Sequence, residues 1–203
     1  MSRKPIGKRT KKVFYIITEG KTEESYISEF TQKYRCSAVK IKKIKPCGAQ
    51  IIHRASEVWK HDKNKGLNPE LKGGVIDKDN RLNLISKGIV IDKDRLTEEE
   101  FNSIKEEAKS KGIGVFFSNS AFEVWLLAHF EPITKAVLSS AELKEKLSRY
   151  LSQEYKKGDA KQLRKIAAHF NQAIKNTKNV CEVSYHTQCT NVGQLCLSLR
   201  EDT

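Results

Sequence analysis

Residues 13–26 have the sequence VFYIITEGKTEESY, which predicts a strand, a turn and a helix in succession. The run from Val13 to Ile17 is apolar, β-branched and aromatic, as is typical of a strand buried on both faces of a parallel sheet. Gly20 marks a tight turn. Thr22 can cap a helix whose apolar residues recur at helical spacing as far as Tyr34. The stretch therefore predicts the first unit of an α/β fold.

Three further apolar segments predict the other strands of this sheet, at Val39–Ile41, Gly88–Ile91 and Ile113–Phe117. Helical patterns lie between them, and Thr97 with Glu100 forms a capping box at the start of the last of these helices. Strands separated by helices of this length indicate βαβ crossovers. We expect an α/β fold with a central, mainly parallel sheet covered by helices on both faces.

The chain divides into three regions by composition. Residues 1–12 are basic and nearly free of apolar side chains, which predicts a flexible arm. Residues 13–130 carry the α/β pattern. Residues 131–203 are dominated by helical stripes, with a short strand considered only near Val180–Val183, and they predict a helical extension packed on the first domain.

The composition is that of a folded soluble protein, with 203 residues, 38% hydrophobic and 31% charged. No run of about 18 apolar residues is present, so neither a membrane span nor a secretory signal is predicted. Five cysteines without a CxxC pair argue against a disulfide framework or a zinc ribbon. We therefore expect a cytoplasmic protein with reduced thiols.

The net charge of +13 arises from 38 Lys and Arg against 25 Asp and Glu. Such an excess attracts polyanions, because bound phosphates release their counterions. Nucleic acid is the partner that this charge predicts. Lys11 and Lys12 of the basic arm are candidate phosphate contacts, although a solvated tail explains the arm equally well.

Two acidic clusters follow predicted buried strands, where open α/β sheets place their ligand sites. In the first, Glu19 lies at the turn and Glu23 in the first helical turn, where an acid also favours the helix dipole. In the second, Asp92 and Asp94 follow the strand that ends near Ile91. Alternation along an extended chain would point both aspartates the same way, and paired carboxylates suit magnesium or manganese.

A near copy of the second cluster occurs earlier in the chain. Val75 to Asp79 has the sequence VIDKD, as does Val90 to Asp94. The later copy follows the better strand and precedes a capped helix. We therefore prefer Asp92 and Asp94, and Asp77 with Asp79 remains the alternative pair.

Three segments together resemble the RloB-like branch of the Toprim proteins. They are ITEGKTEESY at 17–26, VIDKD at 90–94 and SNSAFEVWLLAHF at 118–130, and the end from Thr190 to Leu199 is similar to the C-terminal helix of that family. The resemblance spans most of the chain and implies a Toprim-like, Rossmann-like fold. Ser120 departs from it, because many relatives have proline there.

The resemblance also implies a metal site. In it, Glu19, Asp92 and Asp94 would be catalytic and would hold magnesium or manganese, with two ions expected. Related nucleases of the overcoming-lysogenisation-defect type add an acid, a serine and a further acid, which correspond here to Glu23, Ser118 and Glu123. Glu123 has an alternative role, because Ser120 and Glu123 also form a capping box.

The sequence-based hypothesis is a metal-dependent nuclease that acts in anti-phage defence and cuts DNA or RNA, including tRNA. Lys21 and Lys93 are candidate phosphate contacts. The resemblance implies an ATPase partner encoded nearby, in keeping with the lack of a P-loop, and a homo-oligomer is left open. The alternatives are a non-catalytic metal-binding or nucleic-acid-binding subunit that regulates a partner, and a primase-like enzyme.

Overall fold

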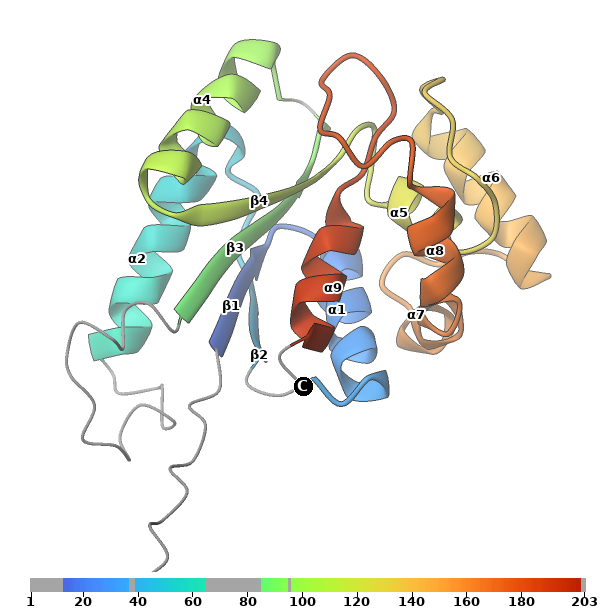
Figure 1. The fold of residues 1–203 in the computed structure, drawn as a ribbon, viewed down its shortest axis with the longest axis horizontal. Helices are drawn as coiled ribbons and strands as arrows, with labels where there is room; N and C mark the ends of the chain where they lie inside the picture. The colour runs from blue at the N-terminus through green and yellow to red at the C-terminus, as the bar shows by residue number, and fades with distance from the viewer. Residues whose placement is uncertain (1–12, 37–38, 65–84, 95, 202–203) are drawn as a thin grey trace, which may run out of the picture.

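The computed structural model describes residues 13–36, 39–64, 85–94 and 96–201. At its centre is a four-stranded sheet in the order β2-β1-β3-β4, in which every neighbouring pair runs parallel (Figure 1). The predicted parallel sheet is confirmed, and the architecture is a Rossmann-like α/β fold. The strands are β1 (Val13–Thr18), β2 (Val39–Lys43), β3 (Ile85–Asp92) and β4 (Ile113–Ser118).

Helices cover both faces of the sheet (Figure 1). One face packs against α2 and α4, the other against α1, α5 and α9, with α6, α7 and α8 further out on the second side. The helical segments are α1 (Lys21–Lys33), η1 (Gly48–Gln50), α2 (Ile51–Asn64), α4 (Glu98–Ser110), α5 (Glu123–Leu127), α6 (Ser140–Leu151), α7 (Ala160–Ala167), α8 (Phe170–Asn176) and α9 (Val192–Glu201).

Alternation along the strands sends successive side chains to opposite faces. Ile16 and Val90 are buried in the cluster that includes α1, α5 and α9. Ile17 and Ile91 are buried in the cluster that includes α2 and α4. Because both faces are covered, each central strand is a nearly continuous apolar run. The same alternation decides toward which face an acid at a strand end points.

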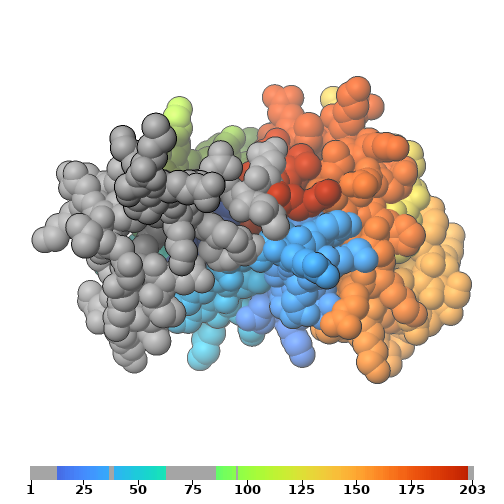
Figure 2. Space-filling view, turned by 60° about the horizontal axis from the view of Figure 1, so that its bottom comes forward, coloured from blue at the N-terminus to red at the C-terminus, as the bar shows by residue number. Residues whose placement is uncertain are grey.

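The C-terminal helices share a hydrophobic core with the sheet. Leu163 of α7 and Phe170 of α8 are buried in the same cluster as Ile16 of β1. At the surface, Arg164 Nε donates to Glu29 Oε2 of α1 at 2.5 Å. Figure 2 shows the surface of α1 beside that of α7 and α8. Residues after 130 are therefore packed directly on the helix that follows β1.

His129 belongs to this core. Its Nδ1 lies 2.9 Å from the Trp125 carbonyl oxygen, and its Nε2 lies 2.9 Å from the Tyr26 hydroxyl. Since a carbonyl can only accept, Nδ1 carries the proton and Nε2 accepts from the tyrosine. Burial lowers the pKa of His129 to about 3, so the ring is neutral at pH 7. His129 is therefore a buried core residue with both ring nitrogens hydrogen-bonded.

Two local predictions are wrong. Thr22 does not cap α1, because the helix begins at Lys21 and Gly20 occupies the N-cap position without a side-chain bond. Val180–Val183 forms no strand; instead, Thr190 makes an antiparallel bridge with Ser118. By contrast, Thr97 and Glu100 form the predicted capping box at the start of α4.

The edge strand β4 is completed by a side chain. Asn191 Oδ1 accepts from the Phe117 N–H at 2.6 Å, and its Nδ2 donates to the Val115 carbonyl at 3.0 Å. The amide thus replaces part of a missing neighbouring strand for two backbone groups of β4. It also fixes the segment before α9 against the end of β4, where Ser118 lies.

We predict that Asn191→Ala lowers the free energy of unfolding by about 2–4 kcal/mol, because it leaves two backbone groups of β4 without their partner. Chemical denaturation measures the loss. The matched control is Asn102→Ala, at an exposed position on α4. Equal losses in the two variants would show that the amide does not support the sheet edge.

Candidate metal centre

The carboxyl ends of the strands bring most of the predicted site residues to one edge of the sheet. Asp92 is the last residue of β3, and it is the register partner of Ser118, the last residue of β4. Glu19 follows β1 directly, and Glu23 lies in the first turn of α1. Parallel strands place all these groups at the same edge, as the sequence predicted.

Asp92, Glu23 and Glu123 form the centre of the site, hereafter the carboxylate cluster. Burial, and then the neighbouring charges of Glu23, Asp94 and Glu123, raise the pKa of Asp92 to about 7 against the opposing effect of Lys157. Burial also raises the pKa of Glu23. Three carboxyl groups that repel one another when ionised are thus brought together between β3, α1 and α5.

Gly20 is required for the position of Glu23. The Glu23 carboxylate folds back toward the start of α1, where its own backbone N–H stabilises the charge. A Cβ at position 20 would overlap this carboxylate. The glycine in the turn after β1 therefore permits a close approach of an acid to the backbone.

Glu123 is a member of the cluster and does not cap a helix. Phe122 occupies the N-cap position of α5 and makes no side-chain cap bond. Ser120 instead has a φ of 79° and donates its hydroxyl to the Leu138 carbonyl at 2.8 Å. The capping-box alternative for Glu123 is therefore wrong. Its carboxylate is buried, with 1% of the residue exposed, and is directed to the cluster.

Two residues of the turn between α6 and α7 contact Glu123. The Tyr155 hydroxyl donates to Glu123 Oε1 at 3.2 Å, and Lys157 Nζ lies 3.2 Å from the same oxygen. Tyr155 is buried and Lys157 is exposed. Gly158 packs on the stem of Lys21, whose Cγ would lie 3.0 Å from a Cβ there.

Tyr155 and Lys157 were not predicted from the sequence. They lie more than thirty residues after Glu123, in a polar turn that no strand precedes, so neither hydrophobic periodicity nor a motif distinguishes them. The only available signal was the pairing of an aromatic residue and lysines between two helical stripes. Contact across the fold, and not local pattern, gives them their place in the site.

Glu19 is bonded outside the carboxylate cluster. Its Oε1 accepts from the Cys47 backbone N–H at 2.6 Å, in the segment that leads from β2 to η1. Because β1 ends at Thr18, strand alternation does not set the direction of Glu19, whose charge is still near enough to raise the pKa of Glu23. Burial, and then Glu19, raise the pKa of Cys47 to about 11. Glu19 thus lies at the rim, and its role as a metal ligand remains a prediction.

Asp94 and Ser118 also differ from the expected geometry. β3 ends at Asp92, and Asp94 is exposed in a turn with a φ of 26°, so strand alternation does not align the two aspartates. Asp94 is nevertheless near enough to raise the pKa of Asp92. The Ser118 hydroxyl is buried and lies 2.8 Å from Thr190 Oγ1.

The lysines predicted to contact phosphate differ in their exposure and in their partners. Lys21 is exposed beside the α6–α7 turn. Lys93 is engaged with Tyr185, since its Nζ donates to the Tyr185 carbonyl at 3.0 Å. Lys11 and Lys12 lie outside the described residues, as does the alternative pair, Asp77 and Asp79.

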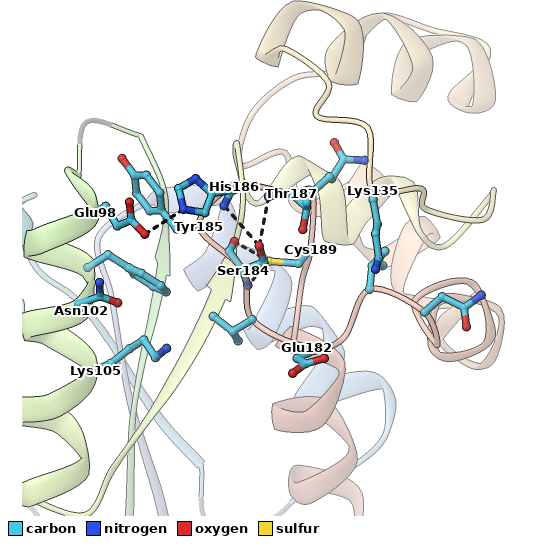
Figure 3. Close-up of a pocket in the computed structure, with 15 residues that line it drawn as sticks. Glu98, Asn102, Lys105, Lys135, Glu182, Ser184, Tyr185, His186, Thr187 and Cys189 are labelled. Atoms are coloured by element: carbon cyan, nitrogen blue, oxygen red, sulfur yellow. Dashed lines mark hydrogen bonds and ion pairs between the residues drawn. The ribbon is translucent and has the colours of Figure 1, made fainter.

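A polar pocket of about 420 Å³ lies between α4 and the loop of residues 179–189 (Figure 3). His186 Nε2 lies 2.9 Å from Glu98 Oε1 and so closes one side of it. Cys189 Sγ lies 3.2 Å from the Ser184 carbonyl oxygen. His186 and Cys189 therefore have separate partners.

The carboxylate cluster is not a closed coordination sphere. Among the described residues, no three His, Cys, Asp or Glu side chains are arranged so that they could hold a metal ion. The chemistry of the donors nevertheless fits a hard divalent cation, because all are carboxylate oxygens and the pKa values of two of them are raised by burial and mutual repulsion. A cation would relieve both effects.

A sequence profile of the RloB-like protein family matches residues 14–199. This chain belongs to the RloB-like family. The match extends from β1 into α9, so it includes the whole carboxylate cluster and both residues of the α6–α7 turn. No curated protein and no solved structure matches the RloB-like chain. Among its described helices, none is both long and apolar enough to cross a membrane.

The raised pKa of Asp92 predicts a pH-dependent stability in the absence of metal. Between about pH 4 and pH 7 the unfolded chain carries this aspartate ionised while the folded protein holds it protonated, so the folded state loses stability as the pH rises. Asp92→Asn removes this loss. We expect its stability relative to the parent to increase by about 2 kcal/mol from pH 5.5 to pH 8.

Denaturant unfolding with chelator present at both pH values measures this difference. Glu106→Gln, at an exposed position on α4, is the control and should show no such pH dependence relative to the parent. If the stability difference between Asp92→Asn and the parent is the same at both pH values, Asp92 is not the partly buried, repelled carboxyl group described above.

Proposed function

We propose that this RloB-like protein is a Toprim-type nuclease that uses magnesium or manganese to cut phosphodiester bonds of nucleic acid. The observation that carries the proposal is the carboxylate cluster, in which Asp92, Glu23 and Glu123 from three elements share one described ammonium group, that of Lys157. Such a cluster is costly unless cations neutralise it. Phosphodiester cleavage needs cations at this kind of position.

The three cluster carboxylates would be ligands of the first metal ion, and their side chains would have to move toward one another to hold it, because the described residues are not arranged as a coordination site. Asp94 and Glu19, whose charges raise the pKa values of Asp92 and Glu23 respectively, would serve a second ion together with Ser118 at the end of β4. The bound metal supplies positive charge that stabilises the phosphoryl oxygens as negative charge develops on them. Glu19 Oε1 is fixed by the Cys47 N–H, so Oε2 is the atom that could hold or transfer a proton.

Lys157 would act on the substrate once cations occupy the cluster. Its ammonium lies beside Glu123 Oε1 without metal, and it is exposed at the surface of the α6–α7 turn. Neutralisation of Glu123 by a metal would release the ammonium to a neighbouring phosphate. A positioned cation of this kind lowers the energy of a transition state that gains negative charge.

Nucleic acid is the substrate that the charge of the chain supports, with 38 basic against 25 acidic side chains. The role in anti-phage defence, the ATPase partner and self-association rest on the family resemblance and form part of the proposal. The rival proposal is a subunit that binds metal or nucleic acid without cutting it.

The direct test is incubation of the purified protein with labelled DNA and total RNA, in magnesium, manganese or chelator. We expect cleavage only with metal, and a loss of at least about 100-fold in Asp92→Ala and Glu123→Gln, because each removes a cluster ligand. Glu106→Gln should cleave like the parent. Binding of nucleic acid by the parent without cleavage would select the rival proposal.

A second test concerns Lys157. Lys157→Met keeps the length of the side chain and removes the charge, and we expect cleavage to fall about 10- to 1000-fold. The neighbouring Lys156→Met is the matched control and should retain activity, because no described acid lies against its ammonium. Equal rates in the two variants would remove Lys157 from the proposed mechanism.

A further inference from the structure

We propose that Tyr185 is a positioning residue for the proposed metal site, because it clamps the turn that carries Asp94. The inference rests on the proposed function, which it deepens. This turn is closed by a hydrogen bond of 2.8 Å from the Leu96 N–H to the Lys93 carbonyl. Asp94 lies within it at a φ of 26°, a backbone conformation that residues other than glycine rarely adopt.

Tyr185 holds both ends of this turn. At one end, Lys93 Nζ donates to the Tyr185 carbonyl at 3.0 Å and lies 3.9 Å from the centre of the Tyr185 ring. At the other end, the Tyr185 hydroxyl donates to the Leu96 carbonyl at 2.8 Å. One residue that is distant in sequence therefore holds the Lys93 side chain before Asp94 and the Leu96 backbone after it.

Tyr185 is itself anchored to the sheet. Asn119, directly after β4, donates from Nδ2 to the carbonyls of Ser184 at 3.1 Å and Tyr185 at 2.7 Å. The Asn119 side chain is fully buried, and the Asn119 backbone N–H donates to the Cys189 carbonyl at 2.9 Å. The clamp therefore connects the end of β4 to the turn after β3, the two elements that carry Ser118 and Asp92.

The packing around the ring restricts it further. Phe101 of α4 lies with its ring centre 6.0 Å from that of Tyr185, and His186 meets the ring edge-on at 5.5 Å. Figure 3 shows Tyr185 and His186 of the loop beside Glu98 of α4. A ring held in this way has few alternative rotamers, so Lys93 meets a fixed surface.

The consequence for the site follows from the position of Lys93. It lies between Asp92 and Asp94, so the clamp that holds its ammonium also sets where the two carboxylates stand relative to each other. A free ammonium would compete with the metal for these carboxylates, whereas an ammonium bound to Tyr185 does not. Partners that orient metal ligands in this way typically change metal affinity 10- to 100-fold when removed.

The test compares Tyr185→Leu, which removes the ring and the hydroxyl without a change of charge, with Tyr185→Phe, which keeps the ring over Lys93. Titration calorimetry measures manganese binding. We expect about a 10-fold or greater loss of affinity in Tyr185→Leu and a smaller loss in Tyr185→Phe. Tyr150→Leu, at an exposed tyrosine of α6, is the control and should bind like the parent.

Amide hydrogen exchange in chelator provides the readout that does not require metal. The Leu96 N–H and the Lys93 N–H, which donates to the Ser118 carbonyl at 3.2 Å, should exchange faster in Tyr185→Leu while amides in the centre of β3 stay protected. Unchanged exchange at both positions would overturn the clamp. Unchanged manganese affinity in a variant whose turn exchanges faster would overturn the positioning role.

These outcomes separate this inference from the proposed function. If the parent binds no manganese and cleaves no nucleic acid, the proposed function fails, and the positioning role fails with it even where exchange shows the clamp. If the parent binds manganese and Tyr185→Leu binds it equally well, only the positioning role fails.

Discussion

The site depends on carboxylates that the fold buries close together with too little positive charge to balance them. Asp92 is fixed in place by the end of β3, and Glu23 by the start of α1. Glu123, the first residue of α5, is buried and accepts a hydrogen bond from Tyr155. Burial and repulsion raise the pKa values of the first two. A protein core gains nothing from such a cluster, so a cation-dependent role explains it better than packing does.

The strands, their parallel arrangement and the edge of the sheet that carries the acids could be predicted from sequence. Apolar runs such as Val13 to Ile17 leave little choice when both faces are covered, and acids after such runs lie at one edge. The N-cap of α1 could not be predicted as easily. Thr22 is a good capping residue, but α1 already begins at Lys21, and Gly20 at the N-cap position leaves room for the Glu23 carboxylate.

The direction of each acid was harder to predict than its position. Asp92 is still part of β3 and belongs to the carboxylate cluster, whereas Glu19 comes after the end of β1 and bonds to the Cys47 N–H. Strand alternation does not set the direction of Asp94, because β3 ends at Asp92. Ser120 and Glu123 satisfied a capping pattern that the structure does not use, because Ser120 adopts positive φ and bonds to Leu138. Local rules fail where tertiary contacts decide.

The C-terminal helices are part of the site and not an appendage to it. Tyr155 and Lys157 cover Glu123, Thr190 bonds to Ser118, and Tyr185 holds the turn after Asp92. Without these residues, the acids at the sheet edge would be exposed to solvent, and water would screen much of the repulsion between them. The acids and the groups that enclose them therefore form one functional unit. The family match, which continues through residue 199, includes all of these groups.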